Sequence, residues 1–192
     1  TVQRLAGERL HLSHGPIDIV LHAWGNPAAV RAAEAAAIAL FPTILPGLVA
    51  ELPALRQPMD QAPRVSHPVA RRMVEACAPF APIFLTPMAA VAGAVADALL
   101  AEMLTAAPLT RAYVNDGGDI AVHVAPGEAL AIGLAADPRH LALDGALRVA
   151  AGSGIGGVAT SGRHGRSFSL GIADAVTVLA RDAATADAAA TL

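Results

Sequence analysis

The sequence predicts an α+β fold in which helices pack on an antiparallel sheet. Alanine-rich stretches with helical periodicity fill much of the chain up to about residue 106, whereas short runs rich in valine, isoleucine and leucine follow from residue 111. Glycines and Asp/Pro pairs separate these later runs, which is typical of consecutive antiparallel strands. Helices followed by such strands favour the α+β class. The 192 residues suit one ordinary domain, so we expect a single domain over residues 1–192.

A β-hairpin is predicted near the start of the chain. Apolar and polar residues alternate on both sides of Gly15–Pro16, in the stretch ERLHLSHGPIDIVLHAWG. A period of two around a turn signal is the pattern of a half-buried hairpin. The side chains expected to face the core are Leu10, Leu12, Ile17 and Ile19.

The first helix is predicted over residues 28–40. Asn26 has the side chain of a helix N-cap, and Pro27 suits the first helical position because its missing N–H would have no helical partner there. Pro42 and Pro46 are expected to interrupt or end this helix, since proline removes a helical hydrogen bond.

Two more helices are predicted after residues 53–68, which are proline-rich and are expected to form a loop or linker. One covers residues 69–80, and the other runs from an N-cap at Thr86 to about Ala106. The runs that predict strands after it are 111–116, 119–124, 129–135, 146–151, 157–161, 167–171 and 174–180.

A final helix is predicted to begin near Asp182, Thr185 or Asp187 and to reach Leu192. It carries no helix-stop signal, so we expect the natural protein to continue beyond this point.

Composition excludes several classes of function. Thirteen basic residues stand against sixteen acidic ones without forming a basic stripe, so no nucleic-acid partner is expected. None of the bases is lysine, which excludes Schiff-base chemistry. The single cysteine, Cys77, cannot form an internal disulfide and is expected to be a buried structural thiol. The longest apolar run, at residues 86–104, is broken by Asp97 and Glu102 and is too short for a membrane span. We therefore expect no membrane partner and a cytoplasmic protein.

Gly152, Gly154 and Gly157 have the spacing of a dinucleotide-binding fingerprint. A Rossmann site requires a helix directly after these glycines, but the stretch VATSG that follows has the pattern of a strand. We therefore interpret the match as accidental. The neighbouring stretch ATSGRHGRS still offers hydroxyls, glycines and arginines that suit a phosphate, and a polar hairpin turn explains it equally well.

Two further stretches carry oxygen ligands. Asp187 and Thr191 stand four residues apart in a helical pattern, so both side chains project from one face. Such a pair suits Mg²⁺, although a solvated helix face explains the spacing as well. The stretch YVNDGGDIAVHV holds Asp116 and Asp119 around a double glycine. On its own it fits a metal site, the rim of a nucleotide pocket or a tight turn.

Taken in order, three segments resemble the ApbE-type FAD:protein FMN transferases. In that family a helix of small residues carries a glycine and, four residues later, an aspartate, which Gly93 and Asp97 match. An N-x-G-G-D-I turn follows, matched by residues 115–120, and then an A-T-S-G segment, matched within 157–162. The closing strand and helix resemble residues 174–191, which end in A-D-A-x-x-T. Residues 1–85 are similar only to a short, uncharacterised branch of the same superfamily.

The resemblance implies an ApbE-like arrangement related to the tunnelling fold, with Mg²⁺ and FAD or FMN as cofactors. It implies that the carbonyl oxygen of Ala89 joins Asp187 and Thr191 as metal ligands. The residues that it places at the flavin pocket, together with two arginines that we add as phosphate clamps, are Asn115, Gly117, Gly118, Asp119, Thr160, Ser161, Gly162, Arg163 and Arg166.

The chain departs from the transferases in two places. Ala92 stands where they usually carry a lysine, and the H-x-x-D-P-x-T-G loop before the last strand is absent. Three functions therefore stay open. The first is a Mg²⁺-dependent flavin or nucleotide-phosphate site that transfers FMN to a threonine of an acceptor protein. The second is a binding module for a flavin or other phosphorylated small ligand. The third is a structural protein whose alanine-rich helices form a homo-oligomer.

Overall fold

The computed structural model describes residues 1–134, 145–162 and 172–192. In this part of the chain seven antiparallel strands form one sheet, in the order β1-β2-β3-β4-β5-β8-β9, and β6 pairs with β7 in a separate hairpin. The α+β class is thus confirmed. The strands are β1 Val2–Arg4, β2 Leu10–His14, β3 Ile17–Trp24, β4 Arg111–Asp116, β5 Asp119–Val124, β6 Ala129–Leu134, β7 Gly145–Ala150, β8 Gly157–Ser161 and β9 Val176–Ala180.

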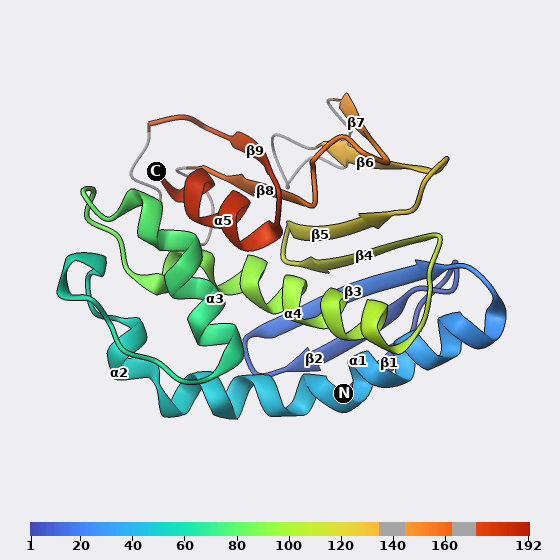
Figure 1. Ribbon diagram of the computed structural model, residues 1–192, viewed down its shortest axis with the longest axis horizontal. Coiled ribbons are helices and arrows are strands. Elements are labelled where there is room, and N and C mark those ends of the chain that lie inside the picture. The colour runs from blue at the N-terminus through green and yellow to red at the C-terminus, as the bar shows by residue number, and fades with distance from the viewer. Residues whose placement is uncertain (135–144, 163–171) are drawn as a thin grey trace.

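Helices cover one face of the large sheet. Figure 1 shows α4 crossing in front of β3 and β4, and one continuous core joins α1, α4 and α5 to the sheet. The helices are α1 Pro27–Ala50, α2 Leu52–Leu55, α3 Pro68–Cys77, α4 Val91–Ala106 and α5 Ala183–Thr191, with 3₁₀ turns η1 Met59–Gln61, η2 Ala78–Phe80 and η3 Pro87–Ala90.

The predicted N-terminal hairpin is confirmed as β2 and β3. Its strands pair from Leu10↔Leu21 to His14↔Ile17, with the turn at Gly15–Pro16. The four side chains predicted to face the core are all buried, and they lie under the helices.

The prediction that prolines would interrupt or end the first helix is wrong. Asn26 caps α1 as expected, accepting a hydrogen bond from the Ala28 amide, but the helix then runs through Pro42 and Pro46 to Ala50. Both prolines are exposed, whereas Phe41, Ile44 and Leu48 face the core. The carbonyls that lose their partners therefore lie on the solvent side, where water can bond them, and core packing holds the helix together.

The segment expected to be a loop or linker, residues 53–68, contains regular structure. It includes most of α2 and all of η1, and Leu55 and Met59 are buried in the core. The Met59 amide also donates to the Leu85 carbonyl, which ties the segment to the chain before η3. The prolines here separate short helical turns. These turns form because the apolar residues between the prolines pack against the core.

The remaining helices begin close to the predicted signals. Thr86 precedes η3, which leads directly into α4, but its side chain makes no capping hydrogen bond. Asp182 is the N-cap of α5, and its carboxylate accepts from the Thr185 amide at 2.7 Å.

The late strands form where predicted, with one difference in pairing. After β5 the chain leaves the sheet as the β6–β7 hairpin, and β5 then pairs with β8. Val122, Leu130 and Val149 form a second small core there, so the hairpin packs against the sheet face that the helices leave open. The predicted strand at 167–171 lies outside the described residues.

By length and hydropathy alone, two helical segments could cross a membrane: Pro27–Ala50 and Pro87–Ala106. Core helices of water-soluble proteins have the same properties, and half of the apolar window in Pro87–Ala106 is buried within the fold. This finding is weak evidence for a membrane, so the absence of a membrane partner and a cytoplasmic location stay predictions.

Candidate functional site

The first turn of α5 lies directly against α4, and Gly93 makes this contact geometrically feasible. A Cβ atom at Gly93 would lie 2.2 Å from the carbonyl oxygen of Ala183 and 2.7 Å from the amide nitrogen of Ala184. No side chain can occupy that space, so glycine is required for the two helices to approach this closely. The spacing of Gly93 and Asp97, singled out in the sequence, therefore serves a helix–helix contact within the chain.

Asp97 fastens the start of α5 to α4. Its carboxylate accepts hydrogen bonds from the amides of Ala183 at 3.0 Å and Ala184 at 2.9 Å. These amides belong to the first turn of α5, where N–H groups have no partner inside the helix. Asp97 is 7% exposed, and Arg72 of α3 lies 3.9 Å from its Oδ2. The buried carboxylate is thus satisfied by two backbone donors and a nearby cation.

Asp187 makes the reciprocal contact, in which a side chain of α5 bonds to the backbone of α4. Its Oδ2 accepts from the Gly93 amide at 3.0 Å, in the first turn of α4. Each helix therefore supplies a carboxylate to the N-terminal amides of the other, Asp97 to α5 and Asp187 to α4. A carboxylate has about four acceptor positions, so the bond to Gly93 fixes Asp187 and leaves capacity for a ligand.

Asp119 belongs to the sheet and lies on the face that the helices cover. The β4–β5 hairpin turns at Gly117 and Gly118, both with positive φ, and Asp116 pairs with Asp119 across its end. Because strand side chains alternate between faces, Asp119 shares the helix-covered face with buried Ala121. Asp119 interacts electrostatically with Asp187.

Burial and neighbouring charges shift the titration of these two carboxyls. Removal from water, together with the charge of Asp97 and opposed by the amides of Gly93 and Ala92, raises the pKa of Asp187 to about 7. Removal from water, together with the charges of Asp187 and Asp116, raises the pKa of Asp119 to about 8. Two carboxyls that share a poorly solvated space resist simultaneous ionisation, and such perturbed groups are common at functional sites.

The other two predicted metal ligands lie on α5 itself and on a 3₁₀ turn that contacts it. The Thr191 hydroxyl donates to the Asp187 backbone carbonyl at 3.2 Å, so one turn of α5 holds both residues as predicted. Ala89 belongs to η3, which contacts α5. Two of the three predicted ligands thus lie on α5, and the third lies on an element that contacts α5.

Several predicted pocket residues have other roles or positions. The Asn115 side chain accepts from the Gly118 amide at 2.8 Å and braces the turn. Thr160 lies on the strand face turned away from α5, because its neighbour Ala159 packs against Ala186 and Ala190 of α5. Its hydroxyl pairs with Thr177 at 2.9 Å.

Strand β8 has two hydroxyl residues, and of these only Ser161 lies on the strand face that α5 covers. The reason is again that side chains alternate between the two faces of a strand. Gly162 is buried, and a Cβ there would lie 2.1 Å from the Asp174 carbonyl oxygen. Arg163 and Arg166, proposed as phosphate clamps, lie outside the described residues.

The glycines of the apparent dinucleotide fingerprint have structural roles, in a turn and in a close contact with α5. A strand, β8, follows them, so a Rossmann site is excluded as the sequence predicted. Gly152 and Gly154 have positive φ in the turn before β8. A Cβ at Gly157 would lie 2.2 Å from the Ala183 amide nitrogen, which makes this glycine a second close contact with α5.

Cys77 is a neighbour of the site that the sequence did not connect with it. The thiol is fully buried and lies 3.6 Å from the Thr86 carbonyl oxygen, to which it donates. Burial and the charge of Asp187 raise its pKa to about 12. The expected burial of this thiol is confirmed, and the residue packs beside the turn that carries Ala89.

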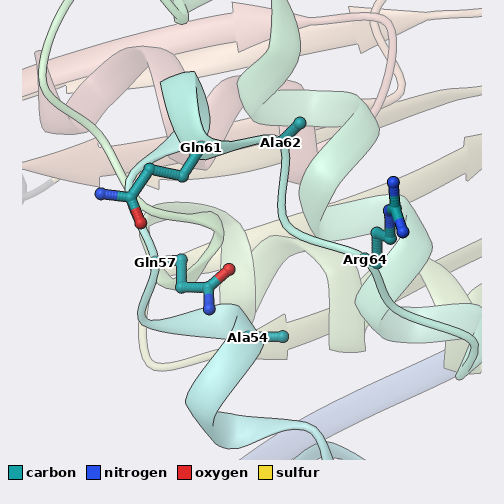
Figure 2. A pocket seen from close by; sticks show the side chains of 5 residues that line it. All are labelled: Ala54, Gln57, Gln61, Ala62 and Arg64. Carbon is teal, nitrogen blue, oxygen red and sulfur yellow. The ribbon is translucent and has the colours of Figure 1, made fainter.

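One cavity, of about 360 Å³, lies elsewhere in the fold. Figure 2 shows that its walls come from α2, η1 and the segment before α3. It contains none of the predicted site residues, and its lining side chains carry no carboxylate. The chemistry of the carboxylate pair, rather than this cavity, therefore marks the candidate site. The lining residues are Ala54, Gln57, Gln61, Ala62 and Arg64.

Comparison with known proteins assigns the chain to a family. A family model described as "AbpE bacteria" matches residues 2–192. The chain belongs to the bacterial AbpE family. The match supports an AbpE-like family for the chain, which is the coarser part of the resemblance seen in the sequence.

The AbpE-family chain is also similar to archaeal proteins named UPF0280. It is 42% identical over 135 residues to one from Methanothrix thermoacetophila, across 70% of this chain and 52% of the relative. It is 39% identical over 123 residues to one from Methanopyrus kandleri, across 64% and 46% respectively. The chain therefore spans about half the length of the curated relatives it matches.

The donor set of this AbpE-family site suits a hard cation that has additional ligands. It offers the carboxylates of Asp187 and Asp119, the hydroxyl of Thr191 and backbone carbonyls, which are all oxygens. Within the described ranges, no three His, Cys, Asp or Glu side chains gather as a metal-binding group. Mg²⁺ is commonly held by one or two carboxylates with water and substrate phosphates. The residues fit that arrangement better than a metal cage built from protein alone.

Proposed function

We propose that the chain is an ApbE-like protein with a Mg²⁺-dependent site for a flavin or another small phosphorylated ligand. The observation that carries this proposal is the electrostatic interaction of Asp119, on the β4–β5 hairpin, with Asp187 of the last helix, where both carboxyls are poorly solvated. Two poorly solvated carboxylates of like charge would be stabilised by a cation, and a phosphate would complete the coordination of that cation.

Each residue of the site has a distinct role in this proposal. Asp187, oriented by the Gly93 amide, and Thr191 would hold the ion together with the carbonyl oxygen of Ala89. Asp119 would add negative charge from the sheet side, and Ser161 could donate to a phosphate oxygen. When bound, the ion would neutralise charge on the phosphates. The turn glycines Gly117 and Gly118 would keep the hairpin end narrow beside the ligand.

A second candidate function is transfer of FMN from FAD to a protein threonine. The threonine oxygen would form a bond to the phosphorus of the FMN half, the bond from that phosphorus to the AMP half would break, and AMP would leave with the electron pair. The observation that favours this function is the pKa of Asp119, raised to about 8, because a group that titrates near neutrality can accept the hydroxyl proton. The departures at Ala92 and in the loop before β9 favour binding alone.

The structural alternative loses part of its support. It assigns the alanine-rich helices to a contact with another copy of the chain, and the face with Ala89 of η3 and Gly93 of α4 has the small residues that such a contact needs. That face is already in contact with α5 of the same chain. A homo-oligomer and an acceptor protein remain expectations without a surface assigned to them.

The test is a titration of the purified protein with FAD, FMN and ADP, each with and without Mg²⁺, followed by calorimetry. We expect at least one of the three to bind, and to bind more tightly with Mg²⁺. Asp187→Asn should remove the Mg²⁺ dependence. Asp60→Asn, at an exposed carboxylate of η1, is the matched control and should keep it.

Absence of binding for all three ligands in the presence of Mg²⁺ would overturn the proposal. To separate the two candidates, FAD and Mg²⁺ are incubated with a threonine-bearing acceptor peptide and released AMP is measured. Binding without AMP release selects the binding module, and AMP release with a flavin-labelled peptide selects the transferase.

A further inference from the structure

The two helices that form the candidate site hold each other through exchanged carboxylates. Asp97 of α4 accepts from the first amides of α5, and Asp187 of α5 accepts from the Gly93 amide in the first turn of α4. Only Asp187 belongs to the proposed metal site. Asp97 lies four residues after Gly93 on α4, and it has no role at the site in the proposed function.

Three features give Asp97 more influence over α5 than an ordinary helix cap has. Its two oxygens bond two successive amides, Ala183 and Ala184, so both the position and the direction of the helix start are fixed. The carboxylate is 7% exposed, so water cannot replace these bonds without opening the core. Arg72 of α3 lies 3.9 Å away and ties the same carboxylate to a third helix.

The amides that Asp97 caps and the carboxylate of Asp187 lie close together on one helix, α5. Asp187 lies about one helical turn after Ala183 and Ala184, so a shift of the α5 start moves its carboxylate by a similar amount. Gly93 leaves no space for the helices to slide, because even a Cβ atom would overlap Ala183. The Gly93–Asp187 hydrogen bond, at 3.0 Å, requires this alignment.

We propose that Asp97 is a positioning residue, which sets the place of α5 on α4 so that Asp187 points into the ligand site. It would touch neither metal nor ligand and would act only through Asp187. This proposal rests on the proposed function for its effect on Mg²⁺. Its effect on the Gly93–Asp187 contact is independent of any ligand.

The test compares Asp97→Asn and Asp97→Ala with a control at the start of α5, Asp182→Asn. Asp182 is the N-cap of α5, and asparagine caps helices as well as aspartate does. Asn at position 97 keeps one acceptor oxygen for the two amides, and Ala keeps none. Two quantities are measured by NMR: hydrogen-exchange protection of the Gly93 amide without metal, and Mg²⁺ affinity from amide shifts.

We expect Gly93 protection to fall about tenfold in Asp97→Asn and further in Asp97→Ala. Mg²⁺ affinity should fall about 10- to 100-fold, as for other residues that orient a metal ligand. Asp182→Asn should change both quantities by less than about twofold. Circular dichroism and urea unfolding establish that each variant is folded.

Unchanged Gly93 protection and unchanged Mg²⁺ affinity in a folded Asp97→Ala protein would overturn the proposal. So would failure of both Asp97 variants to fold, because the residue would then serve global stability. If the wild-type protein binds no Mg²⁺, the proposed function fails, and the metal-free Gly93 measurement still decides the role of Asp97.

Discussion

The two faces of the β4–β5 region are built on different principles. On the helix-covered face, small residues and backbone amides surround the carboxylates of Asp119 and Asp187. On the opposite face, Trp24 stacks on His22 with ring centroids 3.9 Å apart, and the Arg111 guanidinium lies 4.8 Å from the Trp24 ring centroid. One face depends on close distances and single hydrogen bonds, and the other on aromatic contact area.

This difference indicates which positions of the molecule tolerate an amino-acid substitution. A contact made through a missing Cβ atom fails when one carbon is added, whereas a stacked aromatic cluster loses stability roughly with the area removed. The only tryptophan and the only tyrosine of the chain, Trp24 and Tyr113, both lie on the aromatic face, with ring centroids 6.0 Å apart. None of the residues assigned to the candidate site is aromatic, and its polar groups lie among small side chains and backbone amides.

Gly93→Ala should have the largest effect. The new Cβ would overlap the Ala183 carbonyl, so α4 and α5 must separate, at a cost of about 3 kcal/mol or more. Urea unfolding measures the loss. Gly145→Ala is the control, since a Cβ there meets nothing within 4 Å and its φ is ordinary, and its effect should stay within about 0.5 kcal/mol. Equal stability of the two variants would remove the close-contact explanation.

The stability of the metal-free protein should decrease as pH rises. Asp119 and Asp187 have pKa values raised to about 8 and about 7, so between about pH 4 and pH 8 the native state binds more protons than the unfolded state. Stability then falls with pH, by at most about 1.4 kcal/mol per pH unit for each proton. Urea unfolding at several pH values, in chelator, measures this slope.

Two variants locate the origin of this pH dependence. Asp119→Asn should flatten the slope, because it removes one charge of the pair, and Asp60→Asn should preserve it. A metal-free protein that becomes more stable from pH 5 to pH 8 would contradict the assignment of these two carboxyls.

Trp24→Ala should cost about 1 to 2 kcal/mol, because it removes partly buried contact with His22, Arg111 and the small core of the β6–β7 hairpin. Phe84→Ala is the aromatic control, since Phe84 is 72% exposed, and should change stability by less than about 0.5 kcal/mol. If both variants lose the same amount, aromatic packing does not stabilise this face.

Thr160→Val should have the smallest effect. The side chain lies on the face turned away from α5 and pairs with Thr177. Mg²⁺-dependent ligand binding should therefore stay within about twofold of the wild type, whereas Ser161→Ala should weaken it. Calorimetry checks both variants, and loss of binding in Thr160→Val alone would mean that the ligand occupies the other face.

Local patterns in the sequence were sufficient for the elements whose signals are local. The alternation around Gly15–Pro16, the cap at Asn26 and the double-glycine turn all predicted what the structure contains. The continuation of α1 through Pro42 and Pro46 could not be predicted in this way. It depends on which side of the helix faces the core, and that is decided by residues far away in the chain.

The site was predictable only in part, for the same reason. Asp187 was selected from spacing and resemblance, but Asp119 was expected only at the pocket rim. Their proximity arises because α5 covers the sheet near β5, and no local pattern records that packing. The capping role of Asp97 likewise joins residues 86 and 87 positions apart.

The most direct test of the central claim is the place at which a divalent ion binds. Mn²⁺, a paramagnetic substitute for Mg²⁺, is added to ¹⁵N-labelled protein in the presence of ADP, and the loss of each amide signal is followed. The account predicts that the amides of Gly93, Gly118 and Asp187 broaden first, and that Asp187→Asn removes the effect. Broadening that spares these amides and centres on another part of the protein would contradict it.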